Sequence, residues 1–318
     1  MRSGWFTPAI RDLIERMYGI RIKIVVPMRS VVGLLSDRGH FICKPYPYRQ
    51  RSDKERLYAM ATVKLHLAEQ GIGFPFLETI RGKPLLCDRD RMYTVEPWLE
   101  GRHANFVYDS DRKWAIFAIA RLHTTKISIP YVLQTPKLVD KLHDRWKKAR
   151  KCFLQGNHFS DLARDFSQLD RAAFEVLKGL QQPSVQRQLE KDRRRNVLCH
   201  RDLAPHNIII KKDFGATLID YDLVGIDAPI VDLHQMLTHM SFFFRKHDVF
   251  YDELISLYAD QAPLTSTHRE ILALLQRFPM ISSRELVQSS WTQTGPVCKV
   301  ASLRIVDAVG ADLARLAR

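Results

Sequence analysis

The pattern of apolar and polar residues divides the chain into a strand-rich first part and a helix-rich remainder. Short runs rich in β-branched and aromatic residues occur at 20–26, 31–36 and 40–46, with the turn D-R-G before the third. Runs of this length and composition predict three antiparallel strands. Two further short strands are predicted around 76–80 and 92–97.

Helical periodicity accounts for most other segments. Thr7-Pro8 and Gly19 mark the start and end of a first amphipathic helix, and Gly71 ends a second at 53–70. After residue 100, apolar residues recur three and four positions apart, which predicts further helices. These lie near 110–122, 137–153, 161–180, 184–194, 230–240, 267–278, 283–293 and 299–316.

A polar hairpin interrupts the helical part. Two apolar runs, 208–210 and 216–219, flank a polar turn that contains Gly215. This arrangement predicts two paired strands. Such a hairpin returns Asp220 to the side of Asn207, with Asp222 close by.

The segment before the hairpin has the form H-R-D-x-x-x-x-N, from His200 to Asn207. In phosphoryl transfer this pattern supplies a carboxylate that accepts the proton of a substrate hydroxyl, and a carboxamide that binds Mg²⁺. We therefore predict Asp202 as the base, and Asn207 and Asp220 as metal ligands. The alternative is an ordinary polar turn, although these three residue types at these offsets arise by chance in roughly one such chain in a hundred.

Three sites in the strand-rich first part also fit phosphoryl transfer. Lys44 lies at the end of the third strand, where phosphotransferases place the lysine that contacts the α- and β-phosphates. The following helix normally gives that lysine a glutamate partner. Glu55 and Glu69 are candidates, and Glu55 is preferred because Glu69 lies too far along the helix. Backbone groups of Glu96 to Trp98 are expected to meet an adenine edge where the two parts join.

Composition and charge narrow the class of protein. A hydrophobic content of 46% indicates a folded globular chain, and no run of about 18 apolar residues predicts a membrane span. Five widely spaced cysteines without C-x-x-C favour a reducing cytoplasm over a disulfide framework. The net charge of +14 predicts attraction to anions. The basic clusters at 141–151 and 187–195 show neither the repeated aromatic interleaving nor the module signature of a nucleic-acid reader, so nucleic-acid binding is disfavoured.

The whole chain resembles the protein-kinase-like fold in its small-molecule branch, that of aminoglycoside and choline phosphotransferases. It is most similar to the CotS family of spore-coat kinase-like proteins. The residues that carry this resemblance are K-P-Y at 44–46, E-P-W-L-E-G-R at 96–102, A-R-L-H at 120–123, H-R-D-L-A-P-H-N at 200–207, I-D-Y-D at 219–222, D-A-P-I-V-D-L at 227–233, and L-I-S-L-Y, P-L-T-S and R-F-P between 254 and 279.

The resemblance implies an α+β, bilobal fold. A β-rich nucleotide-binding lobe would span residues 1–97, and a mostly helical lobe with the catalytic loop and metal site would span 98–318. It also implies ATP and Mg²⁺ as cofactors, a hydroxyl-bearing small molecule or coat component as acceptor, and other spore-coat proteins as partners. Asp232 would support the catalytic loop. The expected location is the mother-cell cytoplasm, with deposition in the spore coat as a further expectation.

Three departures from the family pattern keep an alternative open. No G-x-G-x-x-G lies between the first two strands, where Gly33 stands alone. Residue 201 is an arginine, yet only eleven residues separate Asp220 from Asp232, too few for a long activation segment. The D-F-G at 213–215 lies in the hairpin turn and is taken as a coincidence. The leading hypothesis is an ATP- and Mg²⁺-dependent phosphotransferase, and the alternative is a catalytically silent structural component of the spore coat.

Overall fold

The computed structural model describes residues 4–127, 131–155, 160–212, 215–243, 248–289 and 296–317. Its first part is a small lobe built on a five-stranded antiparallel sheet in the order β1-β2-β3-β5-β4. The strands are β1 (Ile22–Pro27), β2 (Val32–Ser36), β3 (Gly39–Pro47), β4 (Leu86–Asp88) and β5 (Arg91–Pro97). The three predicted N-terminal strands are therefore confirmed.

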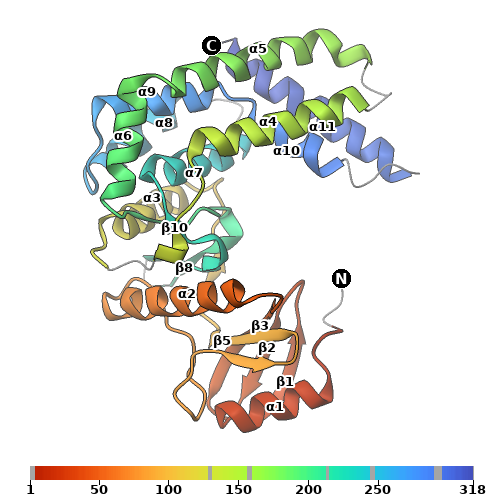
Figure 1. Cartoon of the computed structure of the whole chain (residues 1–318), viewed down its shortest axis with the longest axis vertical. Helices are drawn as coiled ribbons and strands as arrows, with labels where there is room; N and C mark the ends of the chain where they lie inside the picture. Colours follow the sequence, from red (N-terminus) through yellow and green to blue (C-terminus); the bar gives the residue numbers. More distant parts are fainter. Residues whose placement is uncertain are drawn as a thin grey trace.

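Helix α1 (Pro8–Tyr18) covers one face of this sheet (Figure 1). It begins and ends as predicted, because the Thr7 hydroxyl accepts a hydrogen bond from the Ile10 amide and Gly19 adopts the left-handed conformation. Ile14 and Tyr18 pack with alternate residues of the strands in a core of their own. The alternation leaves the other face of β2, β3 and β5 turned toward the rest of the molecule.

Helix α2 (Arg51–Glu69) lies between the sheet and the large lobe (Figure 1). Its buried residues include Leu57, Met60, Val63 and Leu67, and these belong to the hydrophobic core that continues through the large lobe. The small lobe is thus tied to the large one by an extensive apolar contact. The boundary between residues 97 and 98 stays a prediction, because α2 shares its core with the segments beyond it.

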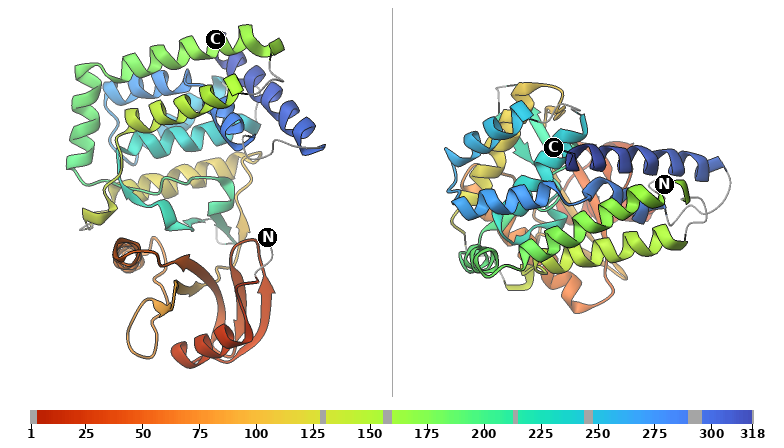
Figure 2. Two further views of the ribbon diagram at one scale, coloured as in Figure 1. Left: turned by 45° about the vertical axis from the view of Figure 1, so that its right-hand side comes forward. Right: turned by 90° about the horizontal axis from the view of Figure 1, so that it is seen from above.

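The large lobe is mostly helical (Figure 2). Its helices are α3 (Asp109–Thr124), α4 (Leu138–Gln155), α5 (Ala163–Leu180), α6 (Pro183–Arg194), α7 (Pro229–Phe243), α8 (Asp248–Ala259), α9 (Ser266–Gln276), α10 (Met280–Ser289) and α11 (Pro296–Leu316). Helix α8 was not among the predicted segments. No helix in the described ranges is both long and apolar enough to cross a membrane.

Short strands at the base of the large lobe face the small lobe. They are β6 (Arg102–His103), β7 (Leu198–Cys199), β8 (Ile208–Lys211), β9 (Gly215–Leu218) and β10 (Gly225–Ile226). Strand β6 follows directly on the link from β5 and pairs with β8. A Cβ atom on Gly101 would lie 2.5 Å from the Ile210 carbonyl oxygen, so only glycine allows the link to approach β8 this closely. The α+β, two-lobed fold predicted from the sequence is confirmed.

Candidate active site

The predicted hairpin is present and sets the positions of the polar residues. Ile208 pairs with Leu218 across strands β8 and β9. Beyond this pair the Ile219 amide donates to the Asn207 carbonyl at 2.9 Å, which brings Asp220 beside Asn207 as predicted. Asp220 itself has φ +62°, a left-handed conformation that aspartate tolerates better than most residues. Of the D-F-G residues, 213 and 214 lie outside the described residues and Gly215 begins β9.

The structure brings Asp202 and Asn207 into direct contact. The Asn207 side-chain amide donates to the Asp202 carbonyl at 2.8 Å and to its carboxylate at 3.0 Å. His200 holds the same loop, because its Nε2 donates to the Ile219 carbonyl at 2.8 Å and its Nδ1 accepts from the Asp202 amide at 3.3 Å. Burial lowers the pKa of His200, which favours the neutral ring that this pair of bonds requires.

Asp232 of α7 anchors the loop that begins at His200, as predicted. Its carboxylate accepts from the His200 amide at 2.6 Å and from the Arg201 amide at 2.8 Å, and it is fully buried. His123 of α3 donates to it at 3.0 Å. Burial alone would raise the pKa of Asp232, but His123 and His200 lower it below its ordinary value. A charged carboxylate therefore fixes the two residues before Asp202.

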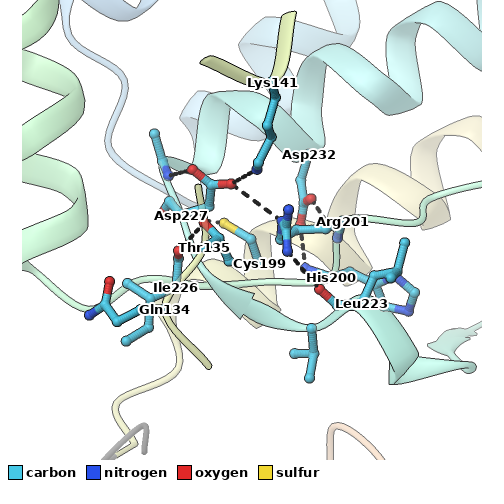
Figure 3. A network of polar contacts seen from close by, with 12 residues as sticks. Gln134, Thr135, Lys141, Cys199, His200, Arg201, Leu223, Ile226, Asp227 and Asp232 are labelled. Atoms are coloured by element: carbon cyan, nitrogen blue, oxygen red, sulfur yellow. Dashed lines mark hydrogen bonds and ion pairs between the residues drawn. The ribbon is translucent and has the colours of Figure 1, made fainter. Parts of the chain in front are cut away.

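Arg201 belongs to a separate polar network (Figure 3). Its guanidinium lies 3.3 Å from the Asp227 carboxylate and donates to the Leu223 carbonyl at 3.2 Å. Lys141 of α4 approaches the same Asp227 oxygen at 2.6 Å. Arg201 thus links the catalytic loop to the segment after Asp220. That Arg201 has no phosphorylated loop to bind stays a prediction.

From the small lobe, Lys44 reaches the segment 220–222, called the metal segment below because it carries the predicted metal ligand Asp220. Its Nζ lies 2.6 Å from a carboxylate oxygen of Asp220 and 2.6 Å from one of Asp222. The predicted pairing of Lys44 with Glu55 is wrong in this structure, because Glu55 is exposed and pairs with Arg51 one turn away. Glu69 is exposed as well. Both glutamates therefore lie on the exposed side of α2.

Glu96 and Trp98 lie where the link begins, but their groups are already engaged. The Glu96 carboxylate pairs with Lys64, a buried residue of α2 whose Nζ lies 4.5 Å from the Phe76 ring centre. The Trp98 amide donates to the His40 carbonyl at 2.9 Å, which extends the β3–β5 ladder. An adenine contact by these backbone groups stays a prediction, and the Trp98 amide would have to exchange its partner to make one.

The turn between β1 and β2 is a tight one. Pro27 pairs with Val32, and the Met28 amide donates to the Val31 carbonyl at 3.1 Å. This turn therefore lacks the string of free glycine amides that covers phosphates in G-x-G-x-x-G proteins. Gly33 has another role, because a Cβ there would lie 2.2 Å from the Trp98 indole. The glycine lets the indole rest against β2.

The residues present fit a divalent cation that prefers oxygen ligands. The Asn207 amide nitrogen makes both bonds to Asp202, so its oxygen is the atom left to ligate a metal. The Asp220 side chain is 38% exposed and supplies a carboxylate beside it. Carboxylate and amide oxygens are the donors that Mg²⁺ selects, with water and phosphate oxygens completing the shell. Asn207 and Asp220 would hold the ion here.

Tyr46, Arg56 and Lys64 take part in the site but were not predicted. Tyr46 donates to the Asp222 carboxylate at 2.7 Å, and Arg56 donates to the carbonyls of Asp222 and Val224 at 3.0 and 3.1 Å. Tyr46 was detectable, because strand periodicity places it on the same face as Lys44. For Arg56 and Lys64 no local pattern indicates which side of the helix faces the cleft.

Comparisons with known proteins agree with this fold. The model of the phosphotransferase enzyme family matches residues 30–271. The chain belongs to this family. Among solved structures it is similar to an aminoglycoside phosphotransferase from Alicyclobacillus acidocaldarius, with TM-score 0.79 and 18% identity over 98% of this chain and 95% of that one.

Two further solved structures show the same fold. The AMP-bound spectinomycin phosphotransferase has TM-score 0.67 and 13% identity, covering 96% of this chain and 97% of that one. The choline kinase from Streptococcus pneumoniae has TM-score 0.60 and 14% identity, covering 96% and 98%. An amicoumacin kinase of this fold was solved with AMP-PNP and Ca²⁺. Phosphotransferases of this fold therefore bind adenine nucleotides, and one of them does so with a divalent cation.

Proposed function

We propose that the protein is an ATP- and Mg²⁺-dependent phosphotransferase that acts on a hydroxyl acceptor. One observation carries this proposal. The fold collects the Asp202 carboxylate, the Asn207 amide, the Asp220 carboxylate and the Lys44 ammonium at one place, where β3, the catalytic loop and the hairpin meet. Phosphoryl transfer depends on this kind of convergence, because it needs positioning and charge neutralisation more than covalent chemistry.

Each residue has a role that follows from its surroundings. Asp202 is held by Asn207 and by the loop that Asp232 anchors, so its carboxylate is oriented to accept the proton of the attacking hydroxyl. Lys44 supplies positive charge for the nucleotide phosphates. A bound Mg²⁺ would neutralise charge on the β- and γ-phosphates, with Asn207 and Asp220 as its protein ligands.

Thermal unfolding tests the proposal directly. ATP at about a hundred times its Kd would stabilise the folded state by about 2.7 kcal/mol. The unfolding entropy of 318 residues is about 0.7 kcal/mol/K, so the melting temperature should rise by about 4 °C. The rise should require both ATP and Mg²⁺, and Asp220→Ala should abolish it. Glu55→Ala removes an exposed carboxylate of the small lobe and should leave the rise intact.

The rival function is a silent kinase-like component of the spore coat. The tight β1–β2 turn and the Trp98 indole packed on Gly33 favour it, because both reduce the groups available to a nucleotide. It predicts that millimolar Mg-ATP leaves the melting curve of the parent protein unchanged. That outcome would replace the phosphotransferase with a structural role among other coat proteins.

The charges beside Asp202 favour a neutral or anionic acceptor. Gln235 of α7 accepts a hydrogen bond from the Leu203 amide at 3.2 Å, which places this face of α7 against the catalytic loop. His239 lies one turn further along the helix. Burial, together with Arg284 of α10 and His206, lowers the pKa of His239 to about 4, and Asp202 opposes this shift. At neutral pH this low pKa leaves the His239 ring uncharged, so Arg284 is the permanent cation of this group and the one that opposes a polycationic acceptor.

A further inference from the structure

The Asp222 carboxylate is fully engaged by the small lobe. One oxygen lies 2.6 Å from Lys44 Nζ, and the other accepts from the Tyr46 hydroxyl at 2.7 Å. Its backbone carbonyl accepts from Arg56 at 3.0 Å. For Asp220, by contrast, Lys44 approaches Oδ1, and no hydrogen bond from a described residue reaches Oδ2. Both oxygens of Asp222 therefore have partners, whereas Asp220 keeps one oxygen without a described partner.

Helix α2, which the structure describes throughout, gives Lys44 no acidic partner. Asp53 caps the start of its own helix by accepting from the amides of Arg49 and Gln50. Glu55 pairs with Arg51, and Glu69 is exposed. The side chains that α2 turns toward the metal segment and β5 are Arg56 and Lys64, both cations. Where kinases of the protein-phosphorylating type place a glutamate for the strand lysine, this chain has positive charge.

We propose that Asp222 is the lasting partner of Lys44, in place of a helix glutamate, and that Arg56 positions the segment that carries it. Asp220 is then released to a metal ion when nucleotide binds. This assignment rests on the proposed phosphotransferase function. It gives Asp222 a positioning role rather than a metal-binding one.

The chemistry of Lys44 suits this division. An ammonium group has three donors, so Lys44 can keep Asp222 and still contact a phosphate after it leaves Asp220. Burial opposes the charge on Lys44, but Asp222 and then Asp220 raise its pKa above the ordinary value. Burial and Asp222 raise the pKa of Tyr46 as well, so its hydroxyl stays protonated and remains a donor. Arg56 acts on backbone carbonyls, which makes its grip independent of the Asp222 side chain.

The first test compares the Mg²⁺ requirement of two isosteric variants. The readout is the Mg²⁺ concentration that gives half of the ATP-induced rise in melting temperature. Asp220→Asn should raise this concentration at least about tenfold, as expected for a metal ligand, whereas Asp222→Asn should leave it within about twofold. Asp222→Asn should instead weaken ATP binding and lower turnover by about 10- to 100-fold. Glu55→Gln is the matched control and should match the parent.

A second readout needs no nucleotide, so it separates this inference from the proposed function. Lys44→Met, Asp222→Asn and the double variant are compared by melting temperature without ligand. Since the two side chains hold each other, the fall in melting temperature of the double variant should be clearly smaller than the sum of the falls of the two single variants. If the parent shows no response to Mg-ATP, the phosphotransferase proposal fails, but this cycle still tests the Lys44–Asp222 pair.

Arg56 is tested by rescue. Arg56→Ala should lower turnover more than it raises the KM for acceptor, and Arg56→Lys should restore part of the loss, because a lysine donor can still reach one carbonyl. The inference is overturned if Asp222→Asn raises the Mg²⁺ requirement as much as Asp220→Asn does. It is also overturned if the losses in the Lys44–Asp222 cycle are additive.

Discussion

Replacing Asp232 by asparagine should destabilise the protein and impair the catalytic loop at the same time. One Asp232 oxygen accepts from the His200 amide and from His123, and the other accepts from the Arg201 amide. An asparagine keeps one acceptor oxygen, so its amide nitrogen must face a donor, most simply the Arg201 N–H. A hydrogen bond to a charged group is worth about 1.5–3 kcal/mol, and an unsatisfied buried donor costs about 1–3 kcal/mol.

These terms lower the free energy of unfolding by about 3 kcal/mol for Asp232→Asn. Solvent does not screen the interaction, because the side chain is fully buried. With an unfolding entropy of about 0.7 kcal/mol/K, the melting temperature should fall by 4–5 °C, roughly. Arg201 has φ +69°, and the hydrogen bond from its backbone amide to the Asp232 carboxylate helps to hold that conformation. Relaxation of the loop would displace Asp202, and a shift of about 1 Å can cost about 10²-fold in turnover.

Asp312→Asn is the matched control. Asp312 of α11 is also buried and accepts from the Ser282 amide at 2.7 Å and hydroxyl at 2.6 Å, but it joins α10 to α11 rather than holding the catalytic loop. Both variants should melt earlier in scanning calorimetry. At a temperature well below both transitions, only Asp232→Asn should have lost turnover. Equal activity in the two variants, or an unchanged melting temperature for Asp232→Asn, would refute the reasoning.

Three further experiments probe the site and its surroundings. Asp202→Asn should cut turnover about 10²-fold or more while leaving the Mg-ATP melting shift intact, and comparable turnover in the variant would remove Asp202 as the base. In a coupled ADP-release assay, glycerate or glycerol should be accepted in preference to kanamycin, and Arg284→Glu should shift the preference toward the cation; no shift would mean that the Arg284 charge does not act on the acceptor. Burial lowers the pKa of His234 to about 3, with Arg315 and Arg145 adding to the effect. Between about pH 6.5 and 3 the unfolded chain therefore binds a proton that the folded chain does not. As the pH is lowered through this range, the free energy of unfolding falls by about 1.4 kcal/mol per pH unit. His234→Phe should reduce that slope in urea titrations, and an unchanged slope would mean that another group titrates.

Local patterns were sufficient for the parts of the site that lie close together in the chain. Asp202 and Asn207 are five residues apart, and the hairpin that returns Asp220 is specified by two apolar runs and a turn. Strand alternation and helix caps likewise predicted β1 to β3 and α1. Each of these features depends on short-range geometry, in which the spacing of residues fixes the direction of side chains.

Only tertiary packing decided which groups meet across the chain. Lys44 and Asp220 are 176 residues apart, and their contact depends on how α2 and the sheet dock on the large lobe. The sequence prediction chose Glu55 as the partner of Lys44, but the rotation of α2 is set by the burial of Leu57, Met60 and Leu67 in the shared core. That burial turns Arg56 inward and Glu55 outward, because a helix places residues one position apart about 100° from each other. A single sequence does not reveal this rotation, since the hydrophobic positions of α2 cover more than one face.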